Sequence, residues 1–256
     1  MRSFFAAIRF LTIFPVPSEW CGGERELARG VWFFPVVGAL LGGGIALADH
    51  WLVRTLPIFP ESVLIVILLL AVSGGLHMDG LSDTADGVLS ARPRERILEI
   101  MKDSHVGAMG VMAIVVVLLF KTSILVLLET PQRGIYLFLT PLLGRASFLF
   151  PMALSRYARE NGGLGSVFAR RRTLGWLAWG GLWMIVPSVF FLGREGGILA
   201  ISTLGLVALF TWYMQRKIGG WTGDTLGALC ELCELLPALV GIVVIFHENS
   251  ETFRIP

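Results

Sequence analysis

Three aspartates that could hold a metal ion, Asp79, Asp83 and Asp86, lie within eight residues of one another, directly after an apolar run at residues 62–72. On an α-helix they are separated by four and then three positions, so their carboxylates share one face. Like charges this close repel each other, and a bound cation would turn the repulsion into ligation. Hard oxygen ligands suit Mg²⁺, with Mn²⁺ as the alternative. The spacing therefore predicts a divalent-metal site, and a solvated acidic loop is the other interpretation.

Two more acidic residues, Glu99 and Asp103, are four positions apart in a stretch whose apolar residues recur at helical spacing. Residues 77–105 are therefore predicted to form two antiparallel helical pieces, the second of which adds Glu99 and Asp103 to the metal ligands. Arg92 and Arg96 lie between the two acidic groups. Carboxylates that hold cations, next to arginines that fit phosphate oxygens, are typical of phosphoryl-group chemistry. We predict that both arginines bind substrate, and the alternative is that they only mark the cytoplasmic side of the membrane.

A glycine-rich segment that contains Thr222, Gly223, Asp224 and Thr225 precedes the last apolar run. Glycine lets the backbone approach a ligand closely, and a helix that starts near Thr225 would direct its positive end toward an anion. These four residues are therefore predicted to bind substrate. The alternative is that Asp224 only caps the helix.

Several ionisable residues lie inside apolar runs, where they are costly and usually functional. Glu231 and Glu234 follow Asp224 on the same helical face, and Lys121 and Arg145 are predicted to pair with polar groups between helices. His77 is either a support for the aspartates or a buried structural residue.

The composition is that of an integral membrane protein. Of the 256 residues, 55% are hydrophobic and only 16% are charged, against about 25% charged in soluble domains. Several apolar runs along the chain approach the length of roughly 20 residues that is needed to cross a bilayer. We predict an all-α polytopic bundle, a single membrane-embedded domain over residues 1–256, with about seven transmembrane helices (six to eight). The predicted spans are residues 31–53, 61–76, 106–128, 135–155, 174–192, 198–214 and 226–246.

The N-terminal segment, residues 1–17, superficially resembles a signal peptide, but Arg9 interrupts its apolar stretch. We predict an uncleaved helix in the membrane interface, with Phe4, Ile8 and Leu11 facing lipid.

Lysine and arginine are distributed unequally between the two sets of loops. With the N-terminus in the cytoplasm, fifteen of the 21 lie on the cytoplasmic side and four on the other, which is the orientation that the positive-inside rule favours. The four on the opposite side are Arg54, Arg133, Arg194 and Arg254. The acidic segment 77–105 and Asp224 are then predicted to face the cytoplasm.

Three motif segments carry a family resemblance. Residues 77–87 read HMDGLSDTADG, residues 98–104 read LEIMKDS, and residues 222–228 read TGDTLGA. Together with the PVP at residues 15–17, and in this order along nearly the whole chain, they resemble the cobalamin synthase family, also called adenosylcobinamide-GDP ribazoletransferases.

The resemblance implies an enzyme of the bacterial cytoplasmic (inner) membrane, with its active site facing the cytoplasm. Such an enzyme joins adenosylcobinamide-GDP to α-ribazole or its 5′-phosphate, releases GMP and uses Mg²⁺. The expected partners are the corrinoid nucleotide, the ribazole substrate and the lipid bilayer. No nucleic acid is expected as a partner, and a homo-oligomer is possible. Asp83 and Asp86, with Asp79 and Asp103 as further candidates, would hold the metal, and Asp103 would accept the proton of the attacking hydroxyl.

The first motif is also similar to that of the CDP-alcohol phosphatidyltransferases. Asp83-x-x-Asp86-Gly87 fits their D-x-x-D-G pattern, but Ala91-Arg92 comes one residue late and Glu99 stands where an aspartate is expected. A phospholipid-synthesising phosphotransferase, which would release CMP, is therefore one alternative. An ion-coupled transporter is another, although its acidic residues would normally lie near the bilayer midplane.

Overall fold

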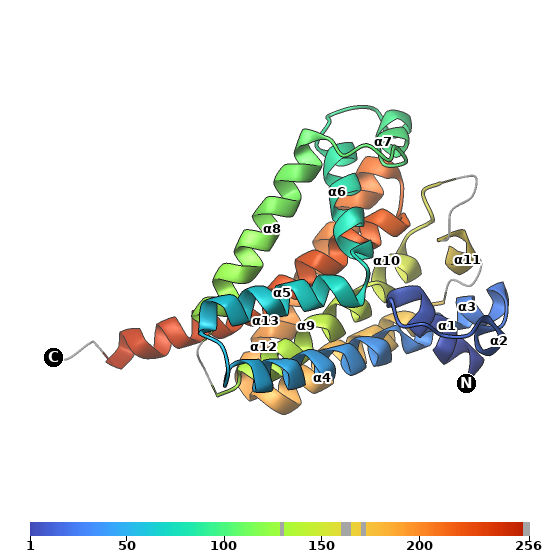
Figure 1. Cartoon of the computed structure of the whole chain (residues 1–256). Coiled ribbons are helices and arrows are strands. Elements are labelled where there is room, and N and C mark those ends of the chain that lie inside the picture. Colours follow the sequence, from blue (N-terminus) through green and yellow to red (C-terminus); the bar gives the residue numbers. More distant parts are fainter. Residues whose placement is uncertain (129–130, 160–164, 170–172, 253–256) are drawn as a thin grey trace.

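The structure is a computed structural model that describes residues 1–128, 131–159, 165–169 and 173–252. Within these ranges the chain is helical and contains no strand, which confirms the predicted all-α class (Figure 1). A lone bridge joins Tyr157 to Trp221. The helices are α1 Arg2–Leu11, α2 Ser18–Cys21, α3 Glu24–Gly30, η1 Val31–Phe33, α4 Phe34–Leu52, α5 Ile58–Val72, α6 Leu76–Val88, α7 Arg94–Ile100, α8 Ala108–Leu127, α9 Arg133–Ser147, α10 Leu149–Leu154, α11 Ser166–Ala169, α12 Gly175–Ile218 and α13 Gly223–Thr252.

Five helices of the described chain are long and apolar enough to cross a membrane, and a sixth span results if the bent pair α5 and α6 is counted as one. The longest of them, α12, contains a break at Gly193, whose φ of 55° is left-handed. A Cβ placed on Gly196 would overlap the carbonyl oxygen of Ser188, although eight residues of straight helix span roughly 12 Å. The chain therefore doubles back at Gly193, as the separate predicted spans 174–192 and 198–214 require. Dividing α12 there adds one to the five or six spans that helix length and composition give.

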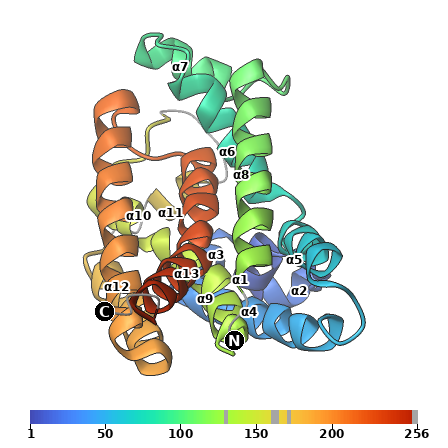
Figure 2. The ribbon, with the colours of Figure 1, turned by 90° about the vertical axis from the view of Figure 1, so that its left-hand side faces the viewer.

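Two consecutive glycines turn the chain between α5 and α6. Gly74 and Gly75 have φ values of 62° and 76°, a region that side chains disfavour, and the two helices meet at 87°. The turn sends α6 back against α8 and α13 (Figures 1 and 2). Its apolar face, which includes Met78 and Leu81, is buried against residues of α8 and α13. The first half of the predicted acidic segment is therefore a packed helix, and a solvated loop is the wrong interpretation for it.

The N-terminal helix α1 packs against protein. Leu11 is completely buried, and Phe4 and Ile8 pack against the same core cluster. The predicted orientation of these three side chains toward lipid is therefore wrong, because the rest of the bundle covers the apolar face of α1. Arg2 and Arg9 on its other face are exposed.

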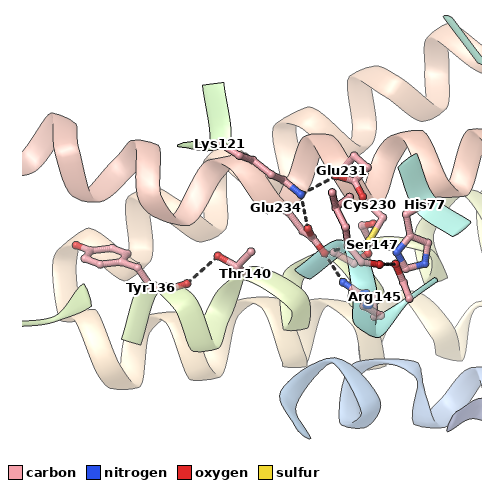
Figure 3. A network of polar contacts seen from close by, with 12 residues as sticks. His77, Lys121, Tyr136, Thr140, Arg145, Ser147, Cys230, Glu231 and Glu234 are labelled. Carbon is pink, nitrogen blue, oxygen red and sulfur yellow. Dashed lines mark hydrogen bonds and ion pairs between the residues drawn. The ribbon is translucent and has the colours of Figure 1, made fainter. Parts of the chain in front are cut away.

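A buried ion-pair network joins α8, α9 and α13 (Figure 3). Lys121 Nζ lies 2.6 Å from Oε2 of both Glu231 and Glu234. Arg145 Nη1 pairs with the other oxygen of Glu234. Two positive and two negative side chains thus balance one another where water is excluded. The predicted pairing of Lys121 and Arg145 between helices is confirmed. Their partners are Glu231 and Glu234 of α13.

A second buried network holds Arg133, which ion-pairs with Asp49 of α4 at 2.7 Å and with Glu61 of α5 at 2.6 Å. Arg133 is therefore a buried residue at the start of α9, and the membrane side predicted for this helix end stays a prediction.

Candidate active site

The site is built where α6 crosses the start of α13. A Cβ on Gly80 would lie 2.7 Å from the carbonyl oxygen of Asp224, and one on Gly227 would lie 3.0 Å from that of His77. Glycine at both contact points lets the two backbones meet. Segments that are far apart in the sequence are thereby placed side by side (Figure 2).

The crossing gathers carboxylates around Asp83. The negative charges that act most strongly on Asp83 are those of Asp79, Asp224 and Asp86, and the positive charge of Arg159 opposes them. Asp79 is exposed, while Asp83 and Asp224 are half-buried. Asp224 therefore lies beside the aspartates of α6, as its predicted part in the same site requires.

Arg159 connects Asp224 to the end of α7. Its Nη2 donates to Oδ2 of Asp224 at 2.6 Å and to the carbonyl oxygen of Met101 at 3.1 Å. Two of the three motif segments thus contact this one guanidinium, and Asp79 of the third lines the same cavity as Arg159. In the sequence Arg159 counted only as one of the cytoplasmic positive charges, because its partner Asp224 comes 65 residues later and no local spacing points to it.

Thr222 is the cap of α13. Its Oγ1 accepts from the Thr225 N–H at 3.2 Å, and its own N–H donates to Thr225 Oγ1 at 2.8 Å, a reciprocal pair of the capping-box kind. Thr222 Oγ1 also lies 3.2 Å from Oδ2 of Asp224. The interpretation of Asp224 as the cap is therefore wrong, and its carboxylate is left for Arg159 and the site. Both threonines are buried, so they position Asp224, while their direct contact with substrate stays a prediction.

Asp86 faces the beginning of α8. Its Oδ2 accepts from the Gly107 N–H at 2.7 Å and its Oδ1 accepts from the Gly110 N–H at 2.8 Å. A carboxylate is favoured there by the positive end of the helix. Each oxygen keeps a second lone pair, so the arrangement fixes Asp86 and leaves it able to bind a metal.

Glu99 and Asp103 do not share a helix, because α7 ends at Ile100. Asp103 lies in the exposed loop that follows, where it accepts hydrogen bonds from His105 N at 3.0 Å and from Nδ1 at 2.6 Å. Aspartate that binds the backbone two residues on favours a turn over a helix, which is why the predicted helical pair fails. The same hydrogen bonds lower the pKa of Asp103 and raise the pKa of His105.

The other residues predicted in this segment lie on the surface. Glu99 pairs with Arg96 at 2.7 Å, with both side chains mostly exposed, and Arg92 is exposed. Arg94, the third arginine of this segment, has a structural role. Its Nε donates to the Ile218 carbonyl oxygen at 2.8 Å and its Nη2 to that of Ala158 at 2.9 Å, so it attaches α7 to the end of α12.

A cavity of about 240 Å³ opens beside the carboxylates. Asp79, Asp224 and Arg159 form its polar wall, and Gly223 and His77 also line it. The rest of its surface is apolar, formed by Phe10, Leu11, Phe34, Leu76, Phe148, Tyr157, Phe168 and Leu226. The site is therefore amphipathic, a property that the sequence does not reveal because its walls come from distant segments.

His77 lines this cavity and is almost completely buried. Its Nδ1 lies 3.5 Å from Cys230 Sγ, and one ligand atom each of His77, Cys230 and Glu234 lies within 4.8 Å of the others. Lys121 and Arg145 already occupy both oxygens of Glu234, and two such cations oppose a metal ion. His77 is thus the buried residue that one of the two sequence interpretations expects.

The fold and the site define a polytopic helical membrane protein in which the segments 77–87 and 222–228 form a carboxylate cluster at an amphipathic cavity. The model of the cobalamin-5-phosphate synthase family matches residues 3–243, and the chain belongs to this family. It is 39% identical over 235 residues to the adenosylcobinamide-GDP ribazoletransferase of Desulforamulus reducens, a match that covers 89% of this chain and 91% of the relative. It is 35% identical over 232 residues to the adenosylcobinamide-GDP ribazoletransferase of Acetivibrio thermocellus, covering 91% and 94%. No solved structure matches the chain.

Proposed function

We propose that this chain joins adenosylcobinamide-GDP to α-ribazole or its 5′-phosphate, with release of GMP, a late step of cobalamin biosynthesis. The relatives that carry the ribazoletransferase name align over about nine-tenths of the chain. The structural observation that carries the proposal is the convergence of the segments 77–87 and 222–228 at the crossing of α6 and α13. Neither a phospholipid-synthesising enzyme nor a transporter is supported by the family match.

The reaction is a displacement at phosphorus. A ribose hydroxyl of the ribazole attacks the phosphorus that carries the cobinamide, a new P–O bond forms, and the bond to the bridging oxygen breaks so that GMP leaves. Holding the two reactants together in line supplies much of the rate gain. The proton of the hydroxyl goes to a carboxylate, for which Asp103 remains our candidate. An aspartate is ionised at neutral pH, so Asp103 can accept the proton.

The oxygen-only donor chemistry of the carboxylate cluster suits a hard divalent cation such as Mg²⁺. Asp79, Asp83 and Asp224 offer only oxygen ligands, and Arg159 is the chief cation that opposes their charges at Asp83. These three residues, with the remaining lone pairs of Asp86, would hold the metal. When bound, Mg²⁺ would neutralise the pyrophosphate and stabilise the leaving GMP.

Arg159 is suited to a phosphate oxygen of the donor substrate. It lines the cavity, and it already holds Asp224 through Nη2. A guanidinium carries five N–H donors, so this contact leaves donors for a phosphate oxygen.

We also propose that the site faces the cytoplasm from the cytoplasmic membrane, on the strength of the lysine and arginine asymmetry. Single cysteines at Arg54 and Arg194, both exposed, should react with an impermeant thiol reagent added outside intact cells. A cysteine at the exposed Arg96 should not. The three native cysteines are buried, so their background labelling is low. The reverse pattern would place the site on the outer side and contradict the proposal.

The function is tested by incubating purified protein with adenosylcobinamide-GDP, α-ribazole and Mg²⁺. Equal amounts of GMP and a cobalamin product should form, as followed by chromatography and mass spectrometry. Absence of both products, with protein that remains folded, would contradict the proposal.

A further inference from the structure

The apolar end of the cavity is an aromatic cluster formed by Phe10, Phe34, Phe148 and Phe168. Phe34 contacts Phe148 and Phe168 with ring centroids 6.0 and 5.7 Å apart, both edge to face. Phe10 lies 5.2 Å from Phe168 and stacks on Phe34 at 5.9 Å. Phe34, Phe148 and Phe168 are almost wholly buried, and all four rings line the cavity, where an aromatic surface suits a planar aromatic ligand.

We propose that the aromatic cluster binds the base of the acceptor nucleoside, which for a ribazole is a flat, apolar, bicyclic benzimidazole. This inference rests on the proposed function and assigns one part of one substrate to one end of the cavity. The sugar, which carries the attacking hydroxyl, then lies toward Asp79, Asp224 and Arg159 at the polar wall.

The size of the cavity favours the base over the other substrate. Pockets for drug-sized ligands begin at about 300 Å³, and this cavity measures about 240 Å³. One bicyclic base is a ligand of this smaller class, whereas a corrin macrocycle with its side chains is far too large. The corrinoid nucleotide is therefore placed outside the cavity, at the exposed Asp79 side of the carboxylate cluster.

The charge of the polar wall favours a neutral nucleoside over a membrane lipid. Asp79 and Asp224 bring two negative charges to the cavity, against the single positive charge of Arg159. Ribose hydroxyls can donate hydrogen bonds to these carboxylates, whereas an anionic phospholipid headgroup would need a bound cation to lie beside them.

His77 supplies a polar contact inside the apolar part. It lines the cavity, and only 3% of its surface is exposed. Its Nε2 has no hydrogen-bond partner among the described residues. The Cys230 thiol lies within reach of His77 Nδ1 at 3.5 Å and of Glu234 Oε1 at 3.7 Å. When the thiol donates to Nδ1, the proton of the imidazole is on Nε2. An N-linked benzimidazole keeps one ring nitrogen as an acceptor, and Nε2–H is the donor that matches it.

Gly223 offers a steric test that leaves the protein undisturbed. It lines the cavity, and a Cβ built there meets no protein atom within 4 Å. Gly223→Ala therefore places a methyl group in the cavity without a collision. Gly205→Ala on the exposed part of α12 is the matched control, since a Cβ there also meets nothing within 4 Å.

The experiment measures binding of α-ribazole to the purified full-length protein by calorimetry, with EDTA present and without the GDP-linked substrate. We expect Gly223→Ala to weaken binding by about tenfold or more, the effect of one carbon in a tight apolar pocket, and Gly205→Ala to bind as the wild type does. Binding of adenosylcobinamide-GDP should be the same in all three proteins. Equal affinity of Gly223→Ala and wild type for α-ribazole would overturn the assignment.

The His77 contact is tested with a second ligand, an indole riboside that lacks the acceptor nitrogen. Wild type should bind α-ribazole more tightly than the indole analogue, and His77→Leu should bind the two alike. A preference that survives in His77→Leu would overturn the contact. These results are separable from the proposed function. A wild-type protein that neither makes cobalamin nor binds α-ribazole would refute the function and the subsite together. If the wild type makes cobalamin and binds α-ribazole, and Gly223→Ala binds α-ribazole equally well, only the subsite is refuted.

Discussion

Gly80 of α6 lies directly against the backbone of Asp224 in α13, so that a Cβ on Gly80 would come within 2.7 Å of the Asp224 carbonyl oxygen. This contact sets the spacing of the two helices that carry the carboxylates. Any side chain at Gly80 would separate Asp224 from Asp83, whose charges now act on each other.

Gly80→Ala should therefore reduce both stability and activity. Overpacking of this kind costs about 1–3 kcal/mol of stability, so the melting temperature in detergent should fall. Because Asp224 is displaced, the rate of GMP release should fall as well. Gly43→Ala on α4 is the control, since a Cβ there meets nothing within 4 Å. Normal activity of Gly80→Ala would show that the close approach of the helices is dispensable.

Thr222 and Asp224 should separate stability from chemistry. Thr222→Ala removes the cap of α13 and should destabilise the protein by about 1 kcal/mol. Asp224→Ser should leave stability near that of the wild type, because Thr222 remains as the cap, yet it should abolish most product formation. Thermal unfolding and GMP release, measured on both variants, distinguish the effect on stability from the effect on the reaction. A fully active Asp224→Ser variant would remove Asp224 from the site.

Lys121→Met should destabilise the bundle by about 3–5 kcal/mol, because it leaves Glu231 and Glu234 buried with less compensating charge. Adding Glu231→Gln to Lys121→Met should recover part of the loss, since Arg145 still pairs with Glu234. The measurement is the unfolding midpoint of the purified variants in detergent. No recovery in the double variant would argue against charge balance as the purpose of the network.

His105 should control the pH dependence of the reaction if Asp103 accepts the proton. Hydrogen bonds from His105 lower the pKa of Asp103, so the carboxylate stays ionised, and active, as the pH falls. In His105→Ala the pKa of Asp103 should rise toward its ordinary value, and the acid limb of the rate profile should move to higher pH. An unchanged acid limb would mean that Asp103 is not the group that titrates there.

Spacing along the sequence identifies the features whose partners are local. The helical repeat of Asp79, Asp83 and Asp86 indicates their shared helix, and runs of apolar residues predict the spans. Features made by tertiary contact escape this reasoning. Arg159 meets Asp224 only after α6 and α13 cross, and the helix face of Leu11 could not be assigned to protein or lipid because both are apolar.

The same distinction explains the error in the 99–103 segment. A helical spacing of Glu99 and Asp103 is real in the sequence, but the hydrogen bonds between Asp103 and His105 favour a turn. The burial of Arg133 could not be predicted from local spacing either, because its partners Asp49 and Glu61 come from two other helices.

The central claim is that the carboxylates at the crossing of α6 and α13 hold the metal on which ribazole transfer depends. The most direct measurement is Mn²⁺ binding by electron paramagnetic resonance, made on the same samples of wild type, Asp83→Asn and Glu99→Gln whose GMP release is assayed. Asp83→Asn should lose both tight Mn²⁺ binding and nearly all turnover while remaining folded. Glu99→Gln, whose parent side chain pairs with Arg96 on the surface, should keep most of both. Undiminished Mn²⁺ binding and GMP release in Asp83→Asn, or full activity of wild type in EDTA, would contradict the account.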